Sequence, residues 1–201
     1  MKTIGKPERV KVVWTNKDVI RIMSVDPGLK NMGICIGDYT LSTNTFKVLS
    51  SETWVGDKYL SHDKEMKKRF IRSFCIIQGM KKELLNIFIP TWTPDYIVCE
   101  GAFYNASFPS AHQALVLVIN LLRECSYIYH QRDIVILPPS VVKGVVTGKG
   151  LSGKEAIQSK IKSHSNIQLL GKDTYTEHEF DAIAHGYAFT QLYFTEPDRS
   201  Q

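Results

Sequence analysis

The sequence predicts an α/β domain with a mixed five-stranded sheet, in which three antiparallel strands are followed by parallel ones and helices cover the faces. The first observation is a series of three short apolar segments near the start, separated only by polar turns, which is typical of an antiparallel meander. The second is that two later apolar segments alternate with stretches of helical periodicity. The third is length, because 201 residues are enough for one domain with its own core.

The five expected strands are short, apolar and rich in β-branched residues. They are predicted at 19–25, 32–36, 45–54, 96–99 and 133–137. The first stops at Asp26, because Pro27 and Gly28 break a strand. The fourth ends at Glu100. We therefore expect acidic residues at the ends of two strands of one sheet.

Four helices are expected around these strands. Apolar residues recur every three to four positions over 62–88, and lysines and arginines occupy much of the rest, which predicts an amphipathic helix. The segment 109–129 is apolar almost all round, which indicates burial on more than one side and makes it the candidate subunit interface. A basic, glycine-rich stretch from Lys143 to Lys154 leads into a third helix that ends near residue 163, and the last helix is expected at 175–193.

The composition is that of a globular protein, and we expect a single domain at 19–195, a polar, basic arm at 1–18 and a short tail at 196–201. A formal net charge of +5 and a pI of about 8.9 permit a polyanionic partner without identifying one. The 4 cysteines form no CxxC pair, a pattern typical of buried, reduced thiols. No segment approaches the roughly 18 apolar residues that span a bilayer, so we expect an intracellular protein without a membrane partner.

Three acidic residues stand where a sheet-based enzyme places metal ligands. Asp26 and Glu100 end strongly apolar strands, and Asp181 lies in the last helix. A lone carboxylate in such surroundings is costly unless a cation or a hydrogen-bond donor accompanies it. His178 lies three positions before Asp181 and shares its helical face, while Glu177, four positions before, is nearly as well placed. The choice between His178 and Glu177 stays open.

Oxygen-rich groups of this kind bind hard divalent ions such as Mg²⁺. Two such ions about 4 Å apart can activate water and stabilise the leaving oxygen in phosphodiester hydrolysis. Ordinary structural roles are equally available to each residue alone. Asp26 could be a turn residue, Glu100 could form a salt bridge, and Asp181 could be a solvated helix position.

Four segments, in order and spanning about 20–193, resemble the RuvC family of Holliday-junction resolvases, which have an RNase H-like fold. IMSVDPGLKNMGICI is similar to the first hairpin of the family, and PDYIVCEGAFYNASFPSAHQAL to its second motif, a strand that ends in a metal-binding glutamate. ILPPSVVKGVVTGKGLSGKEAI is similar to the basic stretch before the third helix, and HEFDAIAHGYAF to the closing helix. The first and last motifs occur across RNase H-like nucleases, whereas the basic stretch narrows the resemblance to resolvases.

The resemblance implies a set of site residues and their cofactor. It places the catalytic metal site, with two Mg²⁺ ions, at Asp26, Glu100, His178 and Asp181. Histidine stands at position 178 where many relatives carry aspartate, and the softer imidazole should make Mn²⁺ acceptable. The basic stretch implies DNA contacts from Lys143, Lys149 and Lys154, with Lys154 close to the scissile phosphate and counted among the catalytic residues. Phe103, or alternatively Tyr104, matches an aromatic residue that stacks on an unpaired base.

Other motifs in the sequence fit less well. The string from Gly148 to Glu155 fits GxxxxGK, but a glutamate replaces the serine or threonine that holds Mg²⁺ in a P-loop, so a flexible, basic, DNA-facing loop explains it better. His178 and Glu179 begin no HExxH zinc motif, because position 182 is alanine. His185 is more typical of a helix histidine with satisfied hydrogen bonds than of a further ligand. The basic residues 67–69 and Arg72 are more typical of a solvated face than of a phosphate contact.

The expected function is therefore that of a homodimeric, structure-selective endonuclease in DNA recombination and repair. A two-fold dimer would present two identical metal sites to a four-way DNA junction and cut paired strands symmetrically. One alternative is an RNase H-like nuclease that acts on other branched or hybrid nucleic acids. The other is a junction-binding protein without catalysis.

Overall fold

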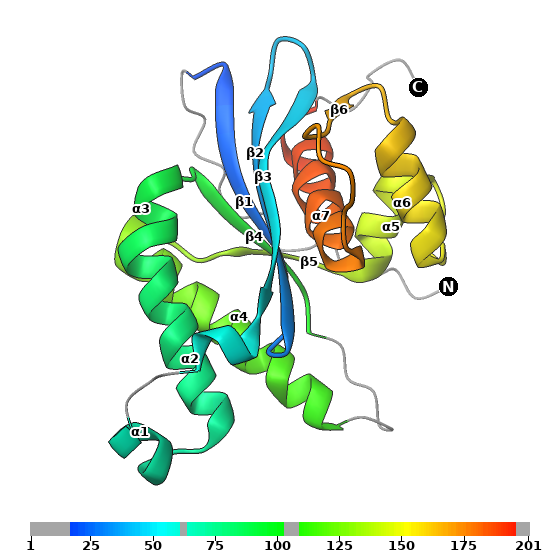
Figure 1. Ribbon diagram of the computed structural model, residues 1–201. Coiled ribbons are helices and arrows are strands. Elements are labelled where there is room, and N and C mark those ends of the chain that lie inside the picture. The colour runs from blue at the N-terminus through cyan, green and yellow to red at the C-terminus, as the bar shows by residue number, and fades with distance from the viewer. Residues whose placement is uncertain (1–16, 61–63, 103–108, 196–201) are drawn as a thin grey trace, which may run out of the picture.

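A computed structural model describes residues 17–60, 64–102 and 109–195. It confirms the predicted α/β class, a mixed sheet with helices on both faces (Figure 1). Most of the predicted N-terminal arm, the tail at 196–201 and the aromatic pair Phe103 and Tyr104 lie outside the described residues.

The sheet has six strands in the order β5-β4-β1-β2-β3-β6. Strands β1 (Val19–Asp26), β2 (Asn31–Thr40) and β3 (Thr45–Val55) form the predicted antiparallel meander. Strand β4 (Tyr96–Glu100) is parallel to β1, and β5 (Val135–Leu137) is parallel to β4. The expectation of five strands was wrong, because β6 (Ile167–Gln168) pairs parallel with the edge of β3. A strand of 2 residues is too short to leave a periodic pattern in the sequence.

The helices follow the predicted order with two corrections. The helix expected at 62–88 is divided: α1 (Lys64–Arg69) ends before α2 (Arg72–Glu83), which continues through a π-helical turn, η2 (Leu84–Phe88), into α3 (Ile89–Trp92). The basic stretch is also more helical than expected. Lys143 lies within α5 (Pro139–Thr147) and Lys154 begins α6 (Lys154–Ser163), so only the connecting turn is irregular.

The remaining helices match the prediction closely, α4 at Pro109–His130 and α7 at Glu177–Tyr193, and a short 3-10 helix, η1 (Gly56–Tyr59), follows β3. All four cysteines are buried and free, as expected. Among the helices of the described segments, none combines the length and the apolar character that a membrane crossing requires.

Each face of the sheet has its own apolar core. Helices α2, α3 and α4 cover one face and α5, α6 and α7 cover the other (Figure 1). The side chains of Met23 and Val25 join the core beneath α2 and α4, whereas Ile22 joins the core beneath α7. Because side chains alternate along a strand, Ser24 and Asp26 face the α7 side.

Helix α7 lies unusually close to the sheet. A Cβ atom on Gly33 would lie 2.0 Å from the carbonyl oxygen of His178, and one on Gly186 would lie 2.7 Å from Ser24 Oγ. The buried Ser24 hydroxyl donates a hydrogen bond of 2.7 Å to the Ala182 carbonyl. Two glycines and a buried serine therefore allow the helix backbone to approach β1 and β2 and fix its height above them.

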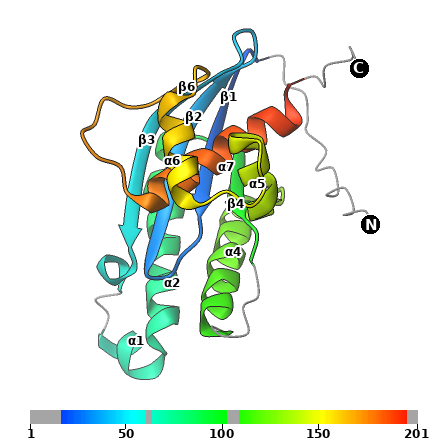
Figure 2. The same ribbon diagram turned by 90° about the vertical axis from the view of Figure 1, so that its right-hand side faces the viewer.

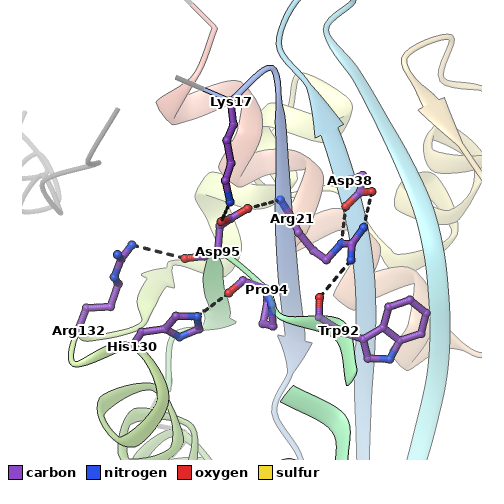
Figure 3. Close-up of polar contacts among 8 residues, drawn as sticks. All are labelled: Lys17, Arg21, Asp38, Trp92, Pro94, Asp95, His130 and Arg132. Carbon is purple, nitrogen blue, oxygen red and sulfur yellow. Dashed lines mark hydrogen bonds and ion pairs between the residues drawn. The ribbon is translucent and has the colours of Figure 1, made fainter. Parts of the chain in front are cut away.

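A polar cluster fixes the first residues of β1, at the end of the strand away from Asp26 (Figure 3). The Arg21 guanidinium donates to both carboxylate oxygens of Asp38, at 2.7 and 2.9 Å, and to the Trp92 carbonyl. Asp95 accepts from the Arg21 backbone N–H and from Lys17. These bonds surround Thr93, whose φ of 45° is left-handed. The cluster ties the end of α3 to β1 and so fixes where β4 begins.

Candidate metal centre

Asp26 and Glu100 are neighbours at the ends of two parallel strands. The register pairs Val25 with Cys99, so the next residue of each strand stands beside its counterpart. Glu100 follows Val98, which packs on the α7 side, and alternation therefore directs Glu100 to that side with Asp26. Both residues are half-buried. The adjacency that the sequence suggested only in outline is thus produced by strand register.

The first two turns of α7 bring His178 and Asp181 to the same place. The helix starts at a capping box, in which Thr176 Oγ1 accepts from the Glu179 backbone N–H and the Glu179 carboxylate accepts from the Thr176 backbone N–H. The Nδ1 atom of His178 lies 2.7 Å from Asp26 Oδ2. Helix α7 therefore carries its site residues onto the end of β1.

Burial and the charges of neighbouring acidic groups raise the pKa values of Glu100 and Asp181. Burial raises the pKa of Glu100 to about 7, with further contributions from the charges of Asp26 and Asp181 and from a hydrogen-bonding contact with Asp26. Burial also raises the pKa of Asp181 to about 6, and the charge of Asp26 adds to the effect. Three acidic groups thus repel one another in a poorly solvated place, which is the electrostatic signature of a cation site.

The donor set suits a hard divalent cation with some tolerance for softer ions, since it combines three carboxylates with one imidazole. Among the described residues, no three histidine, cysteine or acidic side chains already surround a common point as ligands. His178 instead uses Nδ1 against Asp26, and this hydrogen bond is the main reason that the pKa of His178 is raised. Ligation by Nδ1 would require the ring to turn away from Asp26.

Glu177 and His178 differ in exposure and in their shortest polar contacts, although Glu177 Oε1 also lies 3.7 Å from His178 Nε2. Glu177 is exposed and accepts a bond of 3.0 Å from Lys154 Nζ, which is also the main cause of the lowered pKa of Glu177. His178 instead faces the carboxylates. The geometry therefore places Glu177 at the rim of the site, as the partner of a lysine, and His178 inside it.

Of the three lysines predicted to contact DNA, two line the pocket over the carboxylates and one does not. Lys154 and Lys143 both line the pocket described below, and the charge of Lys143 partly offsets the raised pKa of Glu100. Lys149 is exposed in the turn between α5 and α6 and does not line the pocket. Its backbone is held there by hydrogen bonds with Thr147 and Ser152.

A pocket of about 1180 Å³ opens over the carboxylates. Residues of α5, α6 and α7 line one part of the pocket, and residues of α2 and of the start of α4 line another. Helices α2 and α4 both extend past the end of the sheet (Figure 2). The second part includes Arg72, paired with Asp57 at 2.5 Å, while Lys30 comes from the turn between β1 and β2. Basic residues thus line several parts of the pocket around its acidic floor.

Sequence reasoning missed two features of this pocket. Lys30 was not singled out, although a basic residue four positions after Asp26, in the turn beside the strand end, was a readable signal. The sequence predicts that His185 is a helix histidine with satisfied hydrogen bonds, but within the described residues only its Nδ1 atom has a partner, and the side chain lines the pocket. That detail depends on the side-chain conformation, which no sequence pattern shows.

Comparison with known proteins gives a structural likeness without a sequence match. No protein-family model and no curated protein matches the sequence. The fold is similar to that of Thermus thermophilus RuvC in complex with a Holliday-junction substrate, with a TM-score of 0.65 and 13% identity over 89% of this chain and 99% of that one.

Two further solved structures are similar. For the yeast mitochondrial Holliday-junction resolvase, the TM-score is 0.59 and the identity 10%, over 86% of this chain and 79% of that one. For the fowlpox virus resolvase in complex with Holliday-junction DNA, the values are 0.53 and 16%, over 85% and 99%. The chain therefore has an RNase H-like fold. Its variant of this fold is similar to the one in RuvC and in these resolvases.

Proposed function

We propose that this protein is a divalent-metal-dependent endonuclease that resolves four-way DNA junctions. The single observation that carries the proposal is the meeting of Asp26, Glu100 and Asp181, with His178, on the floor of a pocket flanked by cations. A site for hydrolysis of a phosphodiester needs both signs of charge, acidic groups for metal ions and basic groups for the phosphate backbone. The structural likeness to junction resolvases supports the choice of substrate.

Each side chain has a distinct role in the proposed reaction. Asp26, which contacts both Glu100 and His178, would hold the metal ions together with Glu100, His178 and Asp181. Bound Mg²⁺ ions would supply Lewis-acid activation of the attacking water and stabilise the leaving oxygen. Lys154, once it leaves Glu177, offsets the negative charge that develops on the phosphate. Lys143, on α5, approaches the same DNA strand. We expect the site to accept Mn²⁺ in place of Mg²⁺, because the imidazole of His178 is a softer ligand than a carboxylate.

The proposed active unit is a homodimer that uses α4. Outside both cores this helix exposes the large apolar side chains of Leu117 in its middle and of Tyr127, Ile128 and Tyr129 towards its end. A two-fold dimer would repeat the pocket once for each of two symmetric strands of the junction.

One experiment separates the proposal from its alternatives. The protein is incubated with Mg²⁺ and labelled four-way junction, flap, RNA–DNA hybrid and linear duplex, and the products are mapped on each strand. Paired, symmetric nicks in the junction alone are expected. Cutting of flaps or hybrids instead would favour a different RNase H-like nuclease, and binding without cutting would favour a junction-binding protein; either result contradicts the proposal.

A further inference from the structure

Helix α7 presents a third polar side chain beneath His178 and Asp181. His185 follows Asp181 by four positions and His178 by seven, so the three share one face of the helix. Unlike the other two, His185 is only 3% exposed, yet its side chain lines the same pocket. It therefore forms the deep end of a stripe of possible ligands that faces the strand ends.

The hydrogen bonding of His185 fixes its tautomer. Nδ1 lies 2.6 Å from the Asp181 carbonyl oxygen. A carbonyl oxygen can only accept, so Nδ1 carries the proton and Nε2 of the neutral ring is a bare lone pair. A bond from Nδ1–H to a backbone carbonyl is also the usual way in which a metal-binding histidine is oriented.

The lone pair on Nε2 has no donor within the described part of the chain. The atom is buried and unpartnered there, although leaving a buried polar atom unsatisfied costs roughly 1–3 kcal/mol. The negative charge of Asp26 acts on the ring, which places His185 within the field of the acidic cluster. An electron-pair acceptor with positive charge would satisfy the nitrogen and relieve the repulsion among the carboxylates at once. A divalent cation has both properties.

We propose that His185 Nε2 is a second nitrogen ligand of the metal centre, in addition to His178 and more deeply buried than it. This inference rests on the proposed function, because it assumes that divalent cations bind at Asp26, Glu100 and Asp181. Two imidazoles in place of one make the site softer than a carboxylate-only site, so it should favour Mn²⁺ over Mg²⁺.

The test counts the nitrogen atoms bound to Mn²⁺, without DNA and without turnover. Chelator-treated full-length protein is loaded with Mn²⁺, and ¹⁴N couplings are measured by electron spin echo envelope modulation. In His178→Asp, where His185 is intact, one directly bound imidazole nitrogen should remain. In His185→Gln the coupling of His178 should remain alone, and affinity for Mn²⁺ relative to Mg²⁺ should fall by at least roughly tenfold, because the loss of a direct ligand should cost no less than the loss of an outer supporting group.

His164→Gln is the matched control, because both ring nitrogens of His164 are occupied, one by the Asn166 backbone N–H and one by the Tyr187 hydroxyl. It should leave the couplings unchanged. If Mn²⁺ binds but His178→Asp abolishes all ¹⁴N coupling, His185 is not a ligand and the inference fails alone. If the wild-type protein does not bind Mn²⁺ at all, the proposed metal centre itself is wrong, and the inference falls with it.

Discussion

At the scale of single residues, Asp26 connects the parts of the site. It contacts Glu100 across the strand ends and accepts from His178 on α7, and its charge contributes to the raised pKa values of Glu100 and Asp181. A residue with so many charged neighbours is a poor contributor to stability when no cation is bound. Its position is better explained by ligand binding than by folding.

Asp26→Asn should therefore abolish cleavage while leaving junction binding intact. Asparagine keeps the size of the side chain but removes the charge that holds a cation. We expect the cleavage rate to fall by more than the roughly 10- to 100-fold that loss of a supporting outer group costs. Single-turnover cleavage and gel-shift assays measure the two properties. Asp173→Asn is the control, since Asp173 is exposed and does not line the pocket; equal activity of the two variants would refute the role of Asp26.

The pKa shifts predict how the metal-free protein responds to pH. The pKa of Glu100 rises from 4.5 to about 7, that of Asp181 from 3.8 to about 6, and that of His178 lies above 6.5. These three groups thus bind more protons in the folded chain than in the unfolded chain in this window, so their contribution to stability falls as pH rises from about 4 to about 7. Thermal unfolding of the wild-type protein and of Glu100→Gln in chelator, followed across this range, measures that contribution at Glu100; a wild-type protein that gains stability relative to the variant as pH rises would contradict it.

Protons and divalent cations should compete for the same carboxylates. Lowering the pH from about 8 to about 5.5 should weaken Mg²⁺ binding by at least tenfold, or about 1.4 kcal/mol of lost stabilisation. The shift in melting temperature on adding Mg²⁺ should therefore be larger at the higher pH. A shift that does not depend on pH would show that Mg²⁺ binds somewhere other than at groups with raised pKa values.

Much of the candidate site could be predicted residue by residue, and the rest could not. A carboxylate at the end of an apolar strand is costly to bury unless a cation or a hydrogen-bond donor accompanies it. That rule pointed to Asp26 and Glu100 from the sequence alone. The 2.7 Å contact between His178 and Asp26 and the unpartnered Nε2 of His185 depend on rotamers within a folded pocket. The pairing of Glu177 with Lys154, on which the proposed choice of His178 rests, likewise appears only in the folded chain.

At the scale of elements, the closeness of α7 to the sheet determines the site. The helix can lie over β1 and β2 only because positions 33 and 186 carry no side chain. Strand and helix types were readable from hydrophobic periodicity, since each main element buries one face or both. The two-residue β6, and the interruption between α1 and α2, depend on contacts made in the folded chain and were not readable.

Gly33→Ala should displace the start of α7 and damage the site without touching a ligand. The new Cβ atom would lie 2.0 Å from the backbone oxygen of His178, so the helix must move. We expect a loss of about 1–3 kcal/mol in the free energy of unfolding, the usual cost of overpacking, with weaker Mg²⁺ binding. Gly144→Ala, in α5 with nothing within 4 Å of its Cβ position, should instead be neutral or slightly stabilising. Chemical denaturation of both variants tests this, and equal stabilities would contradict it.

At the scale of the whole molecule, the two faces of the sheet have different tasks. The α7 face carries the proposed metal ligands, whereas the other face carries α4 with its exposed apolar side chains. Leu117→Asp combined with Ile128→Asp should weaken self-association by at least about tenfold, or about 1.4 kcal/mol, because charges would be buried at the proposed interface. Leu192→Asp, at a leucine of similar exposure on α7, should not. Sedimentation velocity distinguishes these outcomes, and a monomeric wild-type protein would refute the dimer.

The most direct test of the whole account is anomalous diffraction from a crystal grown with Mn²⁺. We predict a strong anomalous peak in contact with carboxylate oxygens of Asp26 and Glu100 at the strand ends and of Asp181 on α7. A well-diffracting crystal in which these three side chains bind no ion, or in which Mn²⁺ is held elsewhere on the molecule, would contradict the account.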